Sequence, residues 1–276
     1  MTEQYEDDQT GDLNVNRIFK YTSIKEILNE ITGKSAESLK VSVGSKKETQ
    51  IILVYSACGG VGKTTVALGI SACLTKNYKR VLYINAGRLQ SFQRMLENKS
   101  SITASDVYAK LANPSENAYN DVKHVIRQEL FSYLPPFKTS LLSLGLSYSL
   151  YGRLAESAKK SNEYDFIVID AEASFNEDVA KLIDIADKVI VVTKQTMNSV
   201  YATNVLVSNI NGSGSDKYSF ICNDFDKGAD NALISPEIAL KFNVTEYIEH
   251  MEHFDGLECG ELSNSSGIQK TAFLIL

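Results

Sequence analysis

Glycines, a lysine and two threonines follow an apolar run in the first quarter of the chain, with a spacing suited to binding phosphate. The run Ile51–Tyr55 predicts a buried strand, and residues 59–65 read Gly-Gly-Val-Gly-Lys-Thr-Thr. Glycines let successive backbone N–H groups face one concavity, and the helix that follows points its positive dipole end at the same place. Lys63 adds a full charge, and the Thr64 hydroxyl could ligate Mg²⁺ at the terminal phosphates. The predicted phosphate-binding residues are Gly59, Gly60, Val61, Gly62, Lys63, Thr64 and Thr65. A glycine turn without a ligand is the alternative, and the strand-and-helix context disfavours it.

Two later polar residues stand at the ends of apolar runs, where they could complete a nucleotide site. Asp170 ends the strand predicted at 166–169, and a carboxylate there could hold magnesium through its water shell. An aspartate that merely ends a strand or caps a helix is the alternative. Asn223 directly follows the strand predicted at 218–222, where its amide could hydrogen-bond the base, although turn chemistry accounts for it equally well. Thr64 and Asp170 are thus the predicted metal ligands, and Asn223 the predicted base contact.

Strands and helices alternate along the chain in the order that a parallel sheet requires. Strands are predicted at 51–55, 80–85, 164–170, 188–193 and 218–222, with a short one near 246–248. Helices are predicted from 63 to about 78, near 176–186 and at about 198–210. A strand, a helix and a second strand over such lengths form a parallel crossover unit. The predicted fold class is α/β, with a mostly parallel sheet and helices on both faces.

The long stretch 88–162 is predicted to be mainly helical, and its pattern indicates no role. Helices are expected around 89–97, 104–112, 118–130 and 147–161, interrupted at 133–137 by two prolines that cannot stand inside a helix. The last residues, from Ile268 on, are predicted to form a helix packed on the core. The alternative, an amphipathic membrane-binding helix, needs basic residues, and only Lys270 is available there.

Composition and charge narrow the classes of function. The 276 residues are 43% hydrophobic and 22% charged, as in ordinary globular proteins. The net charge of −6 and a pI near 5.3 disfavour nonspecific DNA binding. Four widely separated cysteines suggest neither a metal site nor a disulfide framework. Because no run reaches the ~18 apolar residues of a membrane span and the start lacks an apolar signal core, we expect a cytoplasmic protein without a transmembrane segment.

The first 49 residues are predicted to precede the main domain. Residues 1–16 are acidic and polar and are expected to be disordered. Residues 17–33 predict a short strand and an amphipathic helix, which cannot bury themselves alone. Residues 34–49, rich in Ser, Lys, Glu and Gly, are typical of a linker. The main domain is therefore predicted at 50–276.

The glycine doublet before Val61, the strand at 164–170 and the stretch 186–193 together resemble the ParA/MinD class of deviant-Walker P-loop ATPases. The resemblance spans about residues 50–276, and within the class the chain looks most like the TadZ/CpaE branch of pilus-assembly localisation factors. Residues 18–28 resemble the last strand and helix of that branch's receiver-like N-terminal domain, which implies a truncated domain here. The resemblance implies ATP and Mg²⁺ as cofactors and an ATP-dependent homodimer with two nucleotides face to face. It also implies pilus or secretion assembly proteins as partners, through which any polar or membrane association would be indirect.

Departures from the family pattern point to weak hydrolysis. Active members carry a lysine before the glycine doublet that reaches the partner's phosphates, and that position is Cys58. The family's two aspartates after the second strand, one of which orients the attacking water, are replaced within Asn85-Ala86-Gly87. Glu172 stands where the family usually has proline, and Ala57 stands where the loop usually opens with glycine. A structural substitution at Cys58 is favoured over a redox-sensitive thiol, the other interpretation.

Retained phosphate ligands and lost catalytic groups together predict the function. We expect an ATP-binding switch or scaffold with little or no hydrolysis, which helps localise or assemble a pilus or secretion apparatus. One alternative is an active partition- or division-site-type ATPase that cycles between dimer and monomer. The other is an interaction module that binds no nucleotide, which retention of Lys63, Thr64 and Asp170 disfavours.

Overall fold

Apolar runs that alternate with helices build a single sheet in the part of the chain that the structure describes. The computed structural model describes residues 48–113, 115, 117–252 and 257–276; the segments predicted at 1–16 and 17–33, and the linker up to 47, lie outside them. The strands are β1 (Gln50–Tyr55), β2 (Val81–Ala86), β3 (Arg127–Gln128), β4 (Ser132–Tyr133), β5 (Phe166–Ala171), β6 (Lys188–Thr193), β7 (Tyr218–Phe225) and β8 (Val244–Glu249).

Helices occupy most of the connections between these strands. The α-helices are α2 (Lys63–Lys76), α3 (Ser105–Ala112), α4 (Ala118–Val122), α5 (Leu150–Ser161), α6 (Glu177–Ile185), α7 (Met197–Val207), α8 (Cys259–Leu262) and α9 (Ser266–Phe273). Short 3-10 helices lie at Phe92–Met95, Lys123–Val125 and Ala232–Ile234.

The order of strands across the sheet is β3-β4-β2-β5-β1-β6-β7-β8. Every pairing is parallel except the one between β3 and β4. Parallel strands share one carboxyl edge, so the loops that follow β2, β5 and β1 stand side by side. The register places Asp170 of β5 opposite Asn85 of β2 and Val54 of β1.

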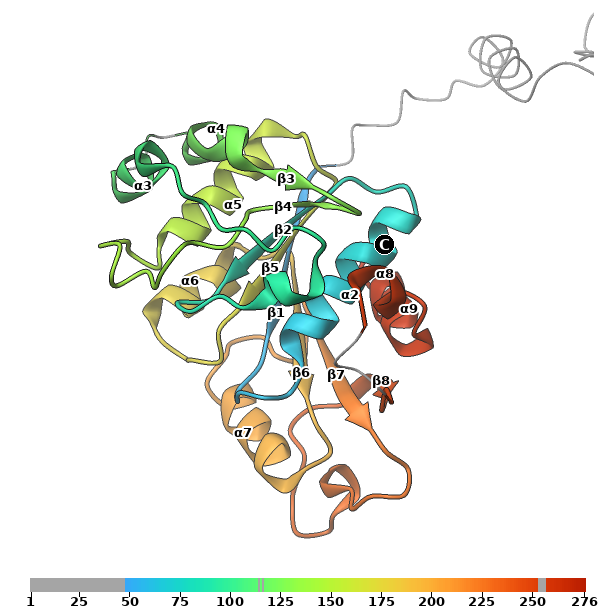
Figure 1. Ribbon diagram of the computed structural model, residues 1–276. Helices are drawn as coiled ribbons and strands as arrows, with labels where there is room; N and C mark the ends of the chain where they lie inside the picture. The colour runs from blue at the N-terminus through green and yellow to red at the C-terminus, as the bar shows by residue number, and fades with distance from the viewer. Residues whose placement is uncertain (1–47, 114, 116, 253–256) are drawn as a thin grey trace, which may run out of the picture. The chain divides into compact units, whose positions relative to one another are not determined.

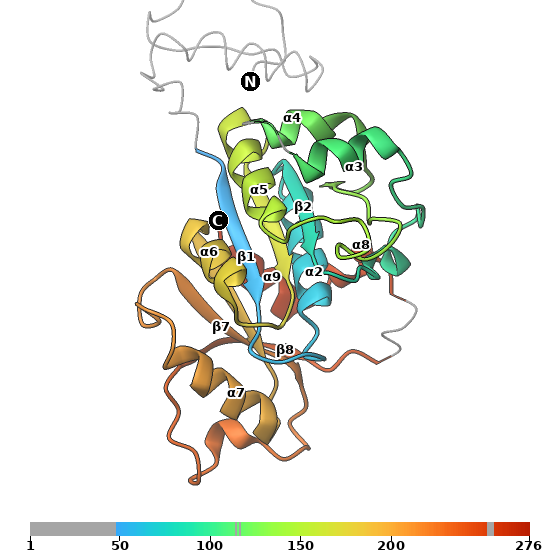
Figure 2. The ribbon, with the colours of Figure 1, turned by 90° about the vertical axis from the view of Figure 1, so that its left-hand side faces the viewer.

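The side chains of β1 alternate between two apolar layers, one on each face of the sheet. Ile51, Leu53 and Tyr55 belong to the cluster formed with α3 to α7, whereas Ile52 and Val54 belong to the cluster formed with α2, α8 and α9. Figure 1 shows α2, α8 and α9 on one side of the sheet and α3 to α6 on the other, and Figure 2 gives a second view of the same layers. The predicted α/β class with helices on both faces is confirmed.

Part of the helical prediction for 88–162 is wrong. The helices near 104–112 and 147–161 are present, but 89–97 contains only the 3-10 turn Phe92–Met95. The helix predicted at 118–130 ends at Val125, and β3 and β4 then form a hairpin at the edge of the sheet. Tertiary packing decides this: Tyr133 is fully buried beside Phe92 and sits in register with Tyr83 of β2.

The chain ends in a helix that packs on the core, as predicted. Ile268 and Thr271 of α9 are fully buried, and Ile268 lies over Gly69 of α2. Glycine is needed at this crossing, because a Cβ on Gly69 would stand 2.7 Å from Ile268 Cδ1. No helix within the described residues has the length and apolarity to cross a bilayer.

Candidate functional site

The predicted phosphate loop joins β1 to α2 and is shaped by two glycines in the left-handed region. Gly60 has φ 76° and Gly62, the residue before α2, has φ 85°. Val61 between them is buried, which anchors the loop to the core. A Cβ on Gly62 would stand 2.2 Å from Asn223 Nδ2, so both backbone conformation and space require glycine there.

Lys63 and Thr64 are the first residues of α2; Thr64 contacts Asp170, and the charge of Asp170 also acts on Lys63. The Thr64 hydroxyl donates to Asp170 Oδ2 at 2.6 Å. Lys63 has no hydrogen bond or ion pair with the residues that the structure describes, and burial lowers its pKa although the charge of Asp170 opposes this shift. The start of the helix therefore holds a cation and a hydroxyl beside a carboxylate, the combination predicted for phosphate and magnesium.

Asp170 is almost wholly buried and receives three hydrogen bonds on one oxygen. Besides Thr64, Asn85 Nδ2 donates to Oδ2 at 2.7 Å and the Tyr83 hydroxyl donates at 3.0 Å. Burial raises the pKa of Asp170, and these donors limit that rise by stabilising the charged form. Sequence analysis noted Asn85 only as a missing aspartate and did not find Tyr83. The pairing of β2 with β5, which brings both donors to Asp170, was the signal it lacked.

Asn223 lies inside β7 and does not follow it, because the strand continues to Phe225. The interpretation as a turn residue is therefore wrong. Its Nδ2 donates to the carbonyl of Val61 in the phosphate loop at 2.9 Å, which ties β7 to the loop. Its Oδ1 is buried and has no hydrogen-bond partner among the described residues. A buried acceptor without a donor is costly, so this atom is suited to receive a donor from a ligand.

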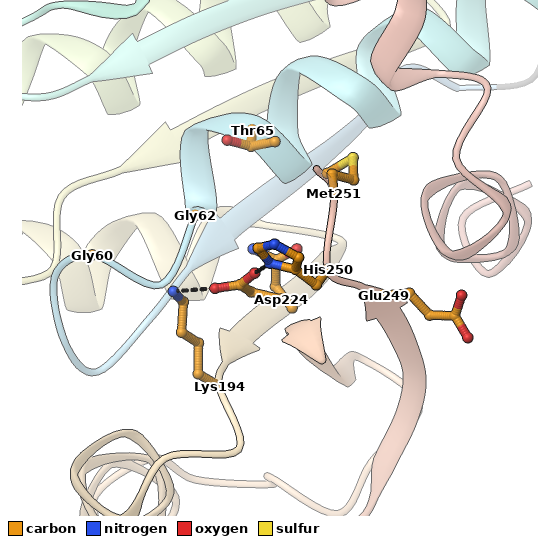
Figure 3. A pocket seen from close by; sticks show the side chains of 9 residues that line it. Gly60, Gly62, Thr65, Lys194, Asp224, Glu249, His250 and Met251 are labelled. Carbon is orange, nitrogen blue, oxygen red and sulfur yellow. Dashed lines mark hydrogen bonds and ion pairs between the residues drawn. The ribbon is translucent and has the colours of Figure 1, made fainter. Parts of the chain in front are cut away.

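A cavity of about 250 Å³ opens beside the loop, and Figure 3 shows it from close by. It is lined by Gly60, Gly62, Thr65, Lys194, Asn223, Asp224, Glu249, His250 and Met251. Three titratable side chains meet on one side of the cavity. Asp224 accepts a hydrogen bond from Lys194 Nζ at 2.6 Å and lies 2.6 Å from His250 Nδ1 (Figure 3). Burial alone would raise the pKa of Asp224, but its two cationic neighbours outweigh that effect and lower it. The hydrogen bond with Asp224 raises the pKa of His250.

Sequence analysis missed Lys194, Asp224 and His250. Lys194 follows β6, His250 follows β8, and Asp224 is the last residue but one of β7. Because these three strands are adjacent and parallel, their carboxyl ends bring the three side chains together. A search for polar residues at predicted strand ends beyond Asp170 and Asn223 could have found them.

The positions that depart from the family pattern have their own partners. Cys58 Sγ lies 3.4 Å from Ser199 Oγ at the start of α7, and Glu172 forms an ion pair with Arg88. Among the described residues no group of three or more His, Cys, Asp or Glu side chains could hold a metal ion. A magnesium ion on Thr64 and Asp170 would thus need phosphate oxygens or water as its remaining ligands.

Comparisons with known proteins find a family profile, sequence relatives and solved structures similar to this chain. The profile of a family described as "AAA domain" matches residues 49–216. The chain is 28% identical over 178 residues to a septum site-determining protein MinD of Emiliania huxleyi. The matched segment is 63% of this chain, and it spans less than two thirds, 63%, of that relative's length.

Two solved structures share the fold. A ParA family ATPase from Chlorobium tepidum superposes with a TM-score of 0.66 at 15% identity, over 83% of this chain and 99% of that one. MinD of Pyrococcus horikoshii, solved with Mg-ADP, superposes with a TM-score of 0.62 at 20% identity, over 82% and 93%. At these identities the two structures show a common fold alone.

Proposed function

The chain belongs to the ParA/MinD class of P-loop ATPases, and from this premise we propose that it binds Mg-ATP as a switch or scaffold and hydrolyses it slowly. One observation carries the proposal: the Thr64 hydroxyl contacts the buried Asp170 at 2.6 Å directly after the glycine loop. A hydroxyl and a carboxylate so placed are the protein groups that a phosphate-bound magnesium ion needs.

The backbone N–H groups of the loop and the charge of Lys63 would bind the phosphates. Thr64 and Asp170 would hold the magnesium ion, which when bound neutralises charge on the terminal phosphates. Gly59 and Gly60 leave open space, since a Cβ on either would meet nothing within 4 Å. These observations support Gly59, Gly60, Val61, Gly62, Lys63, Thr64 and Thr65 as the phosphate-binding set.

Asn223 offers a hydrogen-bond acceptor to the base of the nucleotide. Its Nδ2 is already committed to Val61, which leaves Oδ1 as an acceptor with no partner among the described residues. An acceptor suits the amino group at the six-position of adenine, and it also suits the N1–H and 2-amino group of guanine. The preference for ATP over GTP that we propose therefore rests on the resemblance to the ParA/MinD class, and Asn223 supplies one acceptor for the base.

Slow hydrolysis follows from the groups that the chain lacks. Cys58 offers no cation to a second copy's phosphates, and Asn85 uses its amide to donate to Asp170. A cation acting across an interface is worth about 10³–10⁵ in the rate of phosphoryl transfer. Without it, bound ATP would persist and keep two copies associated as a homodimer.

The cellular role that we propose is to localise or assemble a pilus or secretion apparatus, by binding its proteins in the ATP-bound form. This rests on the resemblance of the sequence to the TadZ/CpaE branch. A partition- or division-site ATPase is the second candidate, and it is favoured by the sequence relative named MinD. The two differ in the lifetime of bound ATP, because a cycling ATPase must release phosphate.

The test follows radiolabelled ATP and released phosphate in one sample over hours, with magnesium and then with excess EDTA. We expect stoichiometric, magnesium-dependent ATP that stays intact, and no binding by Lys63→Ala. Steady phosphate release, abolished in Lys63→Ala, would replace the switch with the cycling ATPase. No bound nucleotide at all would leave the nucleotide-free interaction module.

A further inference from the structure

An arginine and a glutamate join the loops that follow β2 and β5, at the edge of the sheet where the phosphate loop follows β1. Arg88 follows β2 and Glu172 follows β5, and the guanidinium forms an ion pair with the carboxylate. The Arg88 backbone N–H also donates to Glu172 Oε2 at 3.4 Å. Because β5 lies between β2 and β1 in the sheet, this pair stands at the same edge as the loop after β1.

A second arginine–carboxylate pair joins the same two strands at their other end. Arg80 precedes β2 and Asp165 precedes β5, and Arg80 contacts Asp165 Oδ1 at 2.7 Å and Oδ2 at 3.3 Å. The strands between the pairs are hydrogen-bonded over six residues in register. Because backbone hydrogen bonds already join the strands, an arginine–carboxylate pair at the functional end, with a half-exposed arginine, points to a further role.

Arg88 stands close to the proposed magnesium ligands. Asn85, three residues earlier, donates to Asp170, and Glu172 comes two residues after Asp170. The guanidinium lies 4.8 Å from the centre of the Tyr148 ring. Burial raises the pKa of Tyr148; the charge of Arg88 lowers this pKa and the charge of Asp170 raises it, so both charged groups lie near this hydroxyl. The Arg88 side chain is 45% exposed, so it can change partner without unpacking the core.

We propose that Arg88 binds the terminal phosphate of the nucleotide, leaving Glu172 when that phosphate is present and returning to it when it is absent. This inference rests on the proposed function. A guanidinium takes a carboxylate or a phosphate through the same two parallel N–H groups, so the exchange replaces one anion by another. Arg88 thereby supplies, from within the chain, positive charge that Cys58 does not provide. The pair then reports whether ATP or ADP is bound.

The test compares the affinities of Mg-ATP and Mg-ADP by calorimetry for the full chain and four variants. Arg88→Ala removes a charge-assisted contact, and we expect ATP affinity to fall about tenfold or more while ADP affinity is unchanged. Glu172→Gln removes the competing anion, and we expect ATP affinity to rise about two- to fivefold with no change for ADP. Arg80→Ala and Asp165→Asn, at the other end of the strands, are matched controls expected to change neither affinity.

The gain in Glu172→Gln keeps the test independent of folding, since a damaged protein would not bind ATP more tightly. An unchanged ratio of ATP to ADP affinity in Arg88→Ala, with both nucleotides still bound by the unaltered protein, overturns this inference and leaves the proposed function standing. Weaker ATP binding in Glu172→Gln overturns it as well, because Glu172 would then assist the phosphate. If the unaltered protein binds neither nucleotide, the proposed function fails and this inference fails with it.

Discussion

At the residue scale, Asn85 is one of three donors that stabilise the charge of the buried Asp170. Replacing Asn85 with aspartate would put a second carboxylate where an amide now donates at 2.7 Å to a buried oxygen. We expect Asn85→Asp to lower the free energy of unfolding at pH 7 by about 2–4 kcal/mol, measured in urea without magnesium. Adding Mg²⁺ should recover part of the loss, since paired carboxylates are good magnesium ligands.

The loss of stability in Asn85→Asp should depend on pH, because it arises from the charges of two neighbouring carboxylates. Each carboxylate would raise the other's pKa above its unfolded value, so the loss is full at neutral pH and vanishes as pH falls below about 4. Asn85→Ala removes the donor without adding charge, and its smaller loss should depend less on pH. Equal losses at pH 7 for both variants would contradict the electrostatic account.

Gly62 and Gly59 offer a second comparison within one loop. Gly62→Ala must adopt φ near 85° and displace the Asn223 amide from Val61. We expect a loss of about 2–3 kcal/mol in thermal or urea unfolding, the sum of left-handed strain and a lost hydrogen bond. Gly59→Ala meets open space and should change stability by less than about 1 kcal/mol. If Gly62→Ala and Gly59→Ala lowered the free energy of unfolding by similar amounts, the loop would be able to accept a side chain at either position. That result would contradict the special requirement for glycine at position 62.

At the scale of elements, buried parallel strands were the easiest to predict. β6 was predicted at its observed bounds and β1, β2 and β5 to within two residues, because strands covered on both faces appear as continuous apolar runs. The hairpin of β3 and β4 could not be predicted this way, since its four residues gain their conformation from the neighbouring β2. Tyr83 and Asn85 could not be predicted as partners of Asp170 for the same reason, because their contacts depend on the pairing of β2 with β5.

The crossing of α2 and α9 provides a prediction at this scale. Gly69→Ala alone would press a methyl group against Ile268, which is fully buried, whereas Ile268→Ala opens that space. We expect Ile268→Ala to lower the free energy of unfolding by about 2–4 kcal/mol. The loss in the double variant should be smaller than the sum of the two single losses by about 1 kcal/mol or more. Urea unfolding of all four proteins measures this coupling. Additive losses would show that the helices separate to accept the methyl group.

At the scale of the whole molecule, α7 presents an apolar stripe next to the phosphate loop. Met197, Tyr201 and Val205 recur every four residues, so they share one face of the helix, and they are 46%, 65% and 49% exposed. Ser199, on the opposite and buried side of the same helix, contacts Cys58 of the loop, so the helix packs beside the loop with the stripe facing outward. We propose that a second copy that meets the nucleotide face to face also covers this stripe. The proposed homodimer thus gives the exposed apolar residues of α7 a partner.

Tyr201→Glu tests this arrangement, because a charge in the middle of the stripe would have to be buried in the dimer while remaining solvated in the monomer. We expect Mg-ATP-dependent dimerisation, measured by light scattering after gel filtration, to weaken at least about tenfold, with ATP binding and unfolding of the monomer unchanged. Tyr78→Glu is the matched control, since Tyr78 is 97% exposed just beyond the last residue of α2, at the end of that helix away from the loop. A Tyr201→Glu protein that still dimerises like the unaltered chain would exclude α7 from the interface. Equal weakening of dimerisation by both variants would trace the effect to net charge, which is already −6. That outcome would contradict a place for the α7 stripe in the interface.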